Sequence, residues 1–404
     1  MIKKAEDLEA LIEREELFQE MILRGAFSFE ERRRDEEGNF RHTLPEVLLV
    51  WLAAMLCGIR GYRDMEWFAN LKIDFLRRFY PYTYGPPSKS TILRVIALIN
   101  PIAMNDLLLE VVANIERSAP AKITEKHQLP TIALDGKTSC GLQVAGTDQS
   151  KLHVVSAFDT AAGITLMQEA VPDKSNEIVA IKSLLSKLDI EGKTITIDAM
   201  GAQREITGII CQNKGDYVLA VKDNQLSLHQ AIKSFFADRK NCDELTCHET
   251  YDKGHGRIER RTCYASSKAA AWFKGDDWFN LNTVVMVEAE RTIADKSAAC
   301  TRYFISSLPP DAETLLHAIR SHWSIESMHW TLDVTFNEDS RISWHKTVTH
   351  NETIARRIVM NMIKGLRDKY KTRSKTEKAT YNLLQKVLFA DNNTLELLLR
   401  GAFK

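Results

Sequence analysis

The stretch from His317 to Ile342 reads HAIRSHWSIESMHWTLDVTFNEDSRI, and its spacing predicts a helix with one ionisable face. It contains no proline or glycine, and its apolar and aromatic residues recur at helical intervals. Steps of four, three and four residues join four side chains on one face: His322, Glu326, His329 and Asp333. Two tryptophans flank this face on a neighbouring stripe, Trp323 and Trp330. Packing alone does not call for such a face, and we expect it to present Glu326 to a metal site.

Two upstream strands end in the acids that would complete this site. Thr131–Leu134 and Lys193–Ile197 are short, apolar and β-branched, and each is followed at once by an aspartate and soon by a glycine. Either aspartate alone is more readily explained as a turn former. The carboxyl ends of neighbouring parallel strands, however, meet at the ligand-binding edge of a sheet. Asp135 and Asp198 together with a helical carboxylate therefore favour a site.

Two aspartates and a glutamate form a set of hard oxygen ligands, which Mg²⁺ prefers. Without a cation, three gathered carboxylates repel one another. A pair of ions removes that repulsion, activates an attacking oxygen and stabilises a leaving one in an in-line phosphoryl displacement. The chemistry predicted for Asp135, Asp198 and Glu326 is therefore metal-dependent phosphoryl transfer, with water and then a DNA 3′-hydroxyl as nucleophiles.

Other acids and the histidines have weaker patterns. Glu326 and His329 form a Glu-x-x-His pair, but di-iron bundles need a second such pair and this chain has none. His322 and His329 are interpreted as helpers of Glu326 or of a phosphate, or as packing residues. Glu338 and Asp339 follow the helix and are compatible with a surface position.

Composition sets broad limits on the class of protein. A length of 404 residues is typical of two or three domains, and 44% hydrophobic residues can form a substantial core. Lys+Arg and Asp+Glu both number 54, but residues 341–404 hold 14 basic against 5 acidic residues, which suits either a polyanion or a solvated helical surface. The charged start is not a signal peptide, the longest apolar run (Val47–Ile59) is too short to span a bilayer, and the seven cysteines are scattered. These features predict a cytoplasmic protein.

The pattern along the chain divides it into three regions. Residues 1–125 are predicted to form an all-helical domain for DNA binding or dimerisation, with a capping box at Thr43–Glu46. Residues 126–225 show three strands, a helix, a strand, a helix and a strand, which predicts a mixed sheet flanked by helices, and residues 311–404 complete this core with a basic helical end. Residues 226–310 are predicted to be a β-rich insertion before the glutamate helix.

Several long motifs resemble the H-repeat-associated insertion-sequence DDE transposases. They are TIALDGKTSCG, KSNEIVAIKSLL, TIDAMGAQREI, GDYVLAVKDNQ, HGRIERR and the helix quoted above, with RHTLPEVLLVWLAAMLCGIRGYRDMEWFA and GPPSKSTILRV ahead of them. The resemblance covers roughly residues 25–390 and implies an RNase H-like catalytic core whose acidic triad is Asp135, Asp198 and Glu326. It also implies two Mg²⁺ or Mn²⁺ ions, cleavage and strand transfer at terminal inverted repeats, and a homo-oligomer on double-stranded DNA.

The chain departs from the related hairpin-forming transposases at three positions. Those relatives carry Tyr-x-x-Arg before the glutamate and Lys seven residues after it, where this chain has Ile319, His322 and Asp333. These departures weaken the transfer of their phosphate-clamping roles and of a hairpin mechanism to this chain, and the use of a hairpin intermediate stays open.

Candidate DNA contacts and alternative functions complete the predictions. Expected contacts are basic or polar residues near the strand ends, in the insertion and on the glutamate helix: Lys137, Lys222, Asn224, Arg257, Arg260, Arg261 and His322. An active transposase is the favoured function, because all three acids are present. The alternatives are a catalytically silent DNA-binding protein derived from a transposase, and an RNase H-like nuclease acting on other DNA.

Overall fold

The structure is a computed structural model that describes residues 41–118, 128–139, 152–171, 177–238, 245–254, 256–273, 278–293, 296–339, 345–369 and 379–401. The charged start of the chain, residues 1–40, and residues 370–378 of its basic end lie outside these ranges.

A single mixed sheet of nine strands organises the described residues, in the order β3-β2-β1-β4-β5-β9-β8-β7-β6. The core strands are β1 (Thr131–Ser139), β2 (Leu152–Asp159), β3 (Ile164–Val171), β4 (Thr194–Ile197) and β5 (Asp216–Val221). β1, β4 and β5 are parallel, β2 is antiparallel to β1, and β3 is antiparallel to β2 and so runs in the same direction as β1. The order 3-2-1-4-5 with this mixture of directions is the RNase H-like arrangement, and the predicted fold class is confirmed.

The strand that carries Asp135 is longer than predicted. The sequence places the end of this strand at Leu134, but β1 continues to Ser139 because its second half remains paired with β2, with Asp135 opposite Ser156. Its other neighbour, β4, does end as expected, and the last parallel pair is Leu134 with Ile197. Asp135 and Asp198 thus follow the same pair of residues on adjacent strands.

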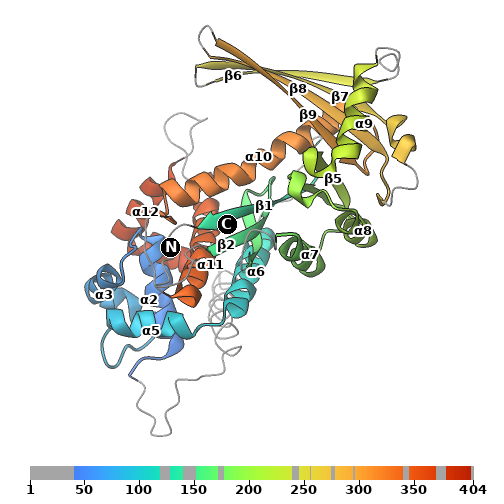
Figure 1. Cartoon of the computed structure of the whole chain (residues 1–404). Coiled ribbons are helices and arrows are strands. Elements are labelled where there is room, and N and C mark those ends of the chain that lie inside the picture. The colour runs from blue at the N-terminus through green and yellow to red at the C-terminus, as the bar shows by residue number, and fades with distance from the viewer. Residues whose placement is uncertain are drawn as a thin grey trace, which may run out of the picture.

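Four more strands extend the core sheet: β6 (Thr246–Gly254), β7 (Arg257–Ser266), β8 (Thr283–Ile293) and β9 (Lys296–Ser306). β9 pairs antiparallel with β5, from Val218–Ser306 to Val221–Tyr303, so the predicted β-rich insertion continues the core sheet. Figure 1 shows these strands projecting beyond the rest of the molecule at the top of the view, with α9 (Leu226–Ala237) beside them and α10 (Ala312–Val334) leading back to the core.

Helices from the two ends of the chain pack together. The first group is α2 (Leu44–Leu56), α3 (Tyr62–Leu71), α4 (Ile73–Leu76), α5 (Lys89–Leu98) and α6 (Pro101–Ser118), and the last is α11 (Lys346–Lys369), α12 (Tyr381–Ala390) and α13 (Asn392–Leu399). The amide of Asn351 in α11 donates to the carbonyls of Ile96 and Ile99, 2.9 Å each, at the end of α5. One buried apolar cluster includes side chains from both groups and from the core sheet. The N-terminal helices are therefore packed onto the core sheet through α11.

The local signals for the first helix are confirmed. Thr43 caps α2 and forms the predicted capping box, with the Thr43 N–H donating to the carboxylate of Glu46 at 2.8 Å.

Helices α7 (Glu177–Lys187) and α8 (Arg204–Gln212) are the crossovers that parallel strands require. Among the described helices no single one is long and apolar enough to cross a membrane, although the bent pair Lys89–Leu98 with Pro101–Ile115 meets the length and hydropathy criteria together.

Candidate active site

Helix α10 lays its ionisable face on β1 and β4. It begins at Ala312, earlier than the quoted stretch, because Asp311 caps its first turn. His322 Nδ1 lies 2.9 Å from Thr196 Oγ1 on β4, and His329 Nδ1 lies 3.4 Å from Asp135 Oδ2 on β1. One turn further on, Asp333 Oδ1 accepts from Lys137 Nζ at 2.6 Å. The predicted stripe therefore shares one face, and this face contacts the sheet.

The three candidate acids gather around these histidines. Glu326 lies on α10 between His322 and His329, and its pKa is raised by partial burial and by the charge of Asp135. Arg302 and His329 have the opposite effect and lower the pKa of Glu326. Asp198 is exposed at the end of β4, where its Oδ1 accepts from the N–H of Met200 at 3.0 Å. The fold thus brings together three acids from distant parts of the chain. The first and the last of them, Asp135 and Glu326, are 191 positions apart in the sequence.

The electrostatics around His322 connect both aspartates to this helix. Burial lowers the pKa of His322, and the charges of Asp135 and Asp198 partly offset that effect. Burial therefore favours the neutral form of the His322 ring, and Thr196 holds one of its nitrogens. A neutral imidazole in this position offers either a donor or an acceptor to a substrate group.

The donor chemistry of this cluster fits a hard divalent ion. All three acids supply oxygen, and the raised pKa of Glu326 is the physical sign of a carboxylate that a cation would stabilise. Within the ranges that the structure describes, no three His, Cys, Asp or Glu side chains are already close enough to hold one ion. Asp135, Asp198 and Glu326 are the oxygen donors of this cluster that could hold such an ion.

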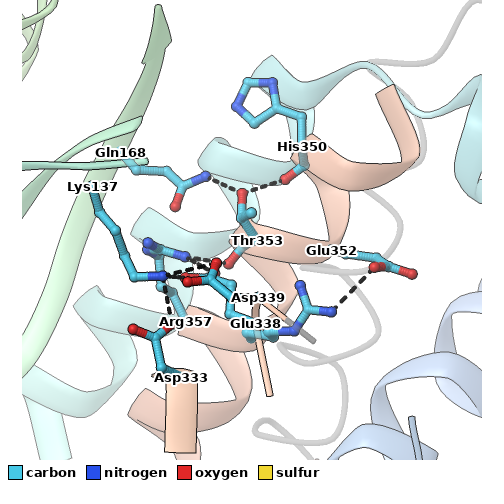
Figure 2. A network of polar contacts seen from close by, with 10 residues as sticks. Lys137, Gln168, Asp333, Glu338, Asp339, His350, Glu352, Thr353 and Arg357 are labelled. Carbon is cyan, nitrogen blue, oxygen red and sulfur yellow. Dashed lines mark hydrogen bonds and ion pairs between the residues drawn. The ribbon is translucent and has the colours of Figure 1, made fainter. Parts of the chain in front are cut away.

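Behind the acids lies a buried ion network that the sequence did not predict (Figure 2). Lys137 Nζ contacts three carboxylates, Asp333 at 2.6 Å, Glu338 at 3.1 Å and Asp339 at 3.4 Å. Glu338 also accepts from Arg357 of α11 at 2.7 Å, and both of these side chains are only 1% exposed. Burial alone would raise the pKa of Glu338, but Arg357 and Lys137 hold it at about 2. The surface position considered for Glu338 is therefore wrong, and this network ties β1, the end of α10 and α11 together.

Several expected DNA contacts have partners inside the protein. The Lys137 side chain is only 9% exposed and is surrounded by carboxylates, so the structure favours a positioning role for it over a DNA contact. The amide of Asn224 donates to the carbonyl of Ala199 at 2.5 Å, which links the end of β5 to the turn after Asp198. Lys222 is exposed at the end of β5 and remains a candidate.

The three predicted arginines of the insertion do not form one cluster. On β7, Arg257 and Arg261 contact Glu259, whereas Arg260 contacts Glu249 of β6. Alternation along a strand places Arg260 on the opposite face of the sheet from the other two. His255, from the same motif, lies outside the described residues.

Two residues near the acids were not predicted from the sequence, and a third was predicted only as a possible helper. Thr196 and Asp198 are two residues apart at the end of β4. Because residues two apart in a strand point to the same face, this spacing could have linked Thr196 to the site. Arg302 reaches the site because β9 runs back toward α10, where its guanidinium lies 4.9 Å from the centre of the Trp323 ring. No local sequence pattern predicts the contact between Arg302 and Trp323. His329, which the sequence predicts to be a helper or a packing residue, is the side chain that approaches Asp135.

Comparison with known proteins identifies the family. The profile described as Transposase DDE domain matches residues 126–362, and the profile described as DDE_Tnp_1-associated matches residues 30–112. The first match alone spans more than half of the chain and contains all three acids. The chain belongs to the DDE transposases. It is thus a transposase, an enzyme of the polynucleotidyl transferase class.

Relatives of this transposase match over most of their length. It is 32% identical to "Putative transposase YncI" of Escherichia coli O157:H7 over 343 residues, which cover 82% of this chain and 85% of the relative. It is 33% identical to "H repeat-associated putative transposase YhhI" of Escherichia coli (strain K12) over 307 residues, 74% of this chain and 79% of the relative. Among solved structures, a piggyBac transposase synaptic complex with hairpin DNA aligns with 96% of this transposase and 79% of that chain, at a TM-score of 0.45 and 11% identity.

Proposed function

We propose that this transposase cleaves DNA at the ends of its own element and joins the freed strand to a target, with Asp135, Asp198 and Glu326 as its catalytic acids. The observation that carries the proposal is the register of β1 and β4. Leu134 and Ile197 are the last parallel pair, so the two following aspartates lie side by side beneath α10. The charge of Asp135 raises the pKa of Glu326 on that helix.

The acids would hold two Mg²⁺ or Mn²⁺ ions. Bound there, the metal pair would supply activation of the attacking oxygen and stabilisation of the leaving oxygen. The chain itself would orient the phosphate. His322, anchored by Thr196, would donate to a phosphate oxygen, and His329 would keep the carboxylate of Asp135 directed toward the site. The Lys137 network would hold β1 and the end of α10 at a fixed separation.

DNA is the substrate that a transposase requires. Double-stranded element ends and a target duplex would occupy the surface around Glu326, and binding to paired ends would need more than one copy of the chain. These points rest on membership of the family and on the acid cluster.

Cleavage of a duplex that carries the source element's ends tests this proposal. With Mg²⁺ or Mn²⁺, wild-type protein should nick the duplex at the element boundary. Asp135→Asn, Asp198→Asn and Glu326→Gln should abolish cleavage but retain DNA binding, since each removes a charge without changing the side-chain size. Glu313→Gln, a matched change near the start of the same helix, should cleave normally. Full activity in any of the three acid variants would refute the assignment.

A second readout does not depend on cleavage. Mn²⁺ should raise the thermal unfolding midpoint of the wild-type protein, because a ligand that binds only the folded state stabilises it. The three acid variants should lose this shift, and Glu313→Gln should keep it. Binding of element ends without any metal effect would instead favour the catalytically silent alternative.

A further inference from the structure

The outer half of the β6–β9 extension is a sheet with two solvent-facing sides. Nearer the core, one side packs on α9, where Tyr303 contacts the rings of His229 and Phe236. The other side packs on α10, where Cys263 and Val287 join a buried cluster with Leu315. Beyond these contacts most residues of the strands are exposed. Figure 1 shows these strands extending past α9 and α10 in the upper part of the view. We name the two sides the α9 face and the α10 face.

The strand register assigns each charged residue of the outer half to one face. Arg261 lies opposite Ala289, Glu259 opposite Arg291 and Arg257 opposite Ile293, all two-residue steps from the Cys263–Val287 pair on the α10 face. The ion pairs agree with this assignment, since Arg257, Arg261 and Arg291 all approach Glu259. Arg260 instead lies opposite Glu290 and contacts Glu249, on the α9 face.

The two faces carry opposite charge. On the α10 face, strand residues 249–302 contribute five cations and two carboxylates: Arg257, Arg261, Arg291, Lys296, Arg302, Asp252 and Glu259. Arg320 of α10 adds a sixth cation, 2.8 Å from Asp252. The α9 face has two cations and three carboxylates: Lys253, Arg260, Glu249, Glu288 and Glu290. The sheet is therefore basic on one side and slightly acidic on the other.

The basic face is arranged for an external anion. Glu259 is only 14% exposed beneath three arginines, and it holds them side by side while their charge exceeds its own. Arg257 and Arg291 remain 42% and 50% exposed. Packing does not explain this surplus, because nothing among the described residues covers the outer part of this face. A polyanion would neutralise it.

The basic face also leads to the acid cluster. Arg302, at the inner end of this face, lies over the ring of Trp323. Its positive charge lowers the pKa of Glu326. Six outer residues of β8 span about 20 Å, which matches about six base pairs of a duplex. An anion that lies along this face would therefore reach the catalytic helix.

We propose that the α10 face of the β6–β9 extension binds the phosphate backbone of duplex DNA and guides it to Glu326, through Arg257, Arg291, Lys296 and Arg302. This inference rests on the proposed function and specifies its DNA-binding surface. It separates Arg260 from Arg257 and Arg261 among the predicted DNA contacts, because Arg260 lies on the other face.

Paired charge neutralisations on the two faces test the proposal. The α10-face variant is Arg257→Gln with Arg291→Gln, and the matched control on the α9 face is Lys253→Gln with Arg260→Gln. Binding of each full-length protein to a duplex of about 30 base pairs is measured by fluorescence anisotropy, without divalent metal, over a series of salt concentrations. Loss of two phosphate contacts should reduce the salt slope by about 1.8 and weaken binding about 60-fold at 0.1 M salt. The control should keep the wild-type slope.

A third variant guards against misfolding of the double variant. Lys296→Gln changes an exposed residue at the start of β9 for which the described residues show no ion pair, and it should reduce the slope by about 0.9. Equal effects from the two faces, or an effect from the α9 face alone, would overturn the proposal. So would unchanged slopes for both the α10-face double variant and Lys296→Gln. If the wild-type protein binds steeply and cleaves while these slopes stay unchanged, the proposed function survives and only the surface is wrong.

Discussion

Replacement of Glu338 by glutamine should destabilise this protein strongly, because it removes the shared anion of a buried network. Glu338 accepts from Arg357 at 2.7 Å and lies 3.1 Å from Lys137, and it is almost fully buried (Figure 2). Its pKa falls from 4.5 to about 2 in the folded protein. That shift corresponds to about 3 kcal/mol of folding free energy. The same magnitude is typical for the loss of one partner from a buried ion pair, about 3–5 kcal/mol.

The effect of this substitution should depend on pH in a defined direction. A carboxyl whose folded pKa is depressed stabilises the protein above its unfolded pKa and loses that contribution as pH falls toward the folded value. For Glu338 the window runs from about 4.5 down to about 2. Wild-type protein should lose about 1.4 kcal/mol of this contribution between pH 7 and pH 3.5. Glu338→Gln lacks the group, so its stability should approach that of wild type over the same range.

Urea unfolding followed by tryptophan fluorescence measures both quantities. Asp339→Asn is the matched control, since Asp339 also lies near Lys137, at 3.4 Å, but its side chain is 36% exposed. Water screens such a pair, and its loss should cost less than about 1 kcal/mol. Equal costs for the two variants, or a gap that stays constant down to pH 3.5, would refute the assignment of Glu338 as the buried centre of the network.

Two further pairs of substitutions test local features of the fold. Thr43→Ala should lower the free energy of unfolding by about 1 kcal/mol in urea titrations, because it removes the cap of α2, whereas Thr43→Ser should be close to neutral. Gly136→Ala should cost about 1–3 kcal/mol, because the added Cβ would lie 2.7 Å from Glu177 Oε1 and 2.9 Å from His153 Nε2. Gly208→Ala, in an open helical position, should instead gain about 0.5–1 kcal/mol. If alanine were equally tolerated at both glycines, the close packing of β1 against α7 would be disproved.

The local periodicities of the sequence predicted the main elements of the site. The steps from His322 to Asp333 identified one helical face, and that face does contact the sheet. The strands before Asp135 and Asp198 were recognisable because β-branched residues and turn signals are local properties. Alternation along β7 could likewise have separated Arg260 from Arg257, since a strand has a period of two residues.

The tertiary structure decided what these elements face. β1 runs beyond Leu134 because β2 continues to pair with it, and that pairing depends on a distant segment. Glu338 follows a helix in a segment without regular period, so nothing local predicts its burial against Arg357 and Lys137. The basic character of one face of the β6–β9 extension follows only when four strands are placed in register and α10 marks the side. Sequence periodicity determines which side chains point the same way, because it reflects backbone geometry. Long-range packing determines where they point, because burial and charge depend on segments that the chain brings together only when it folds.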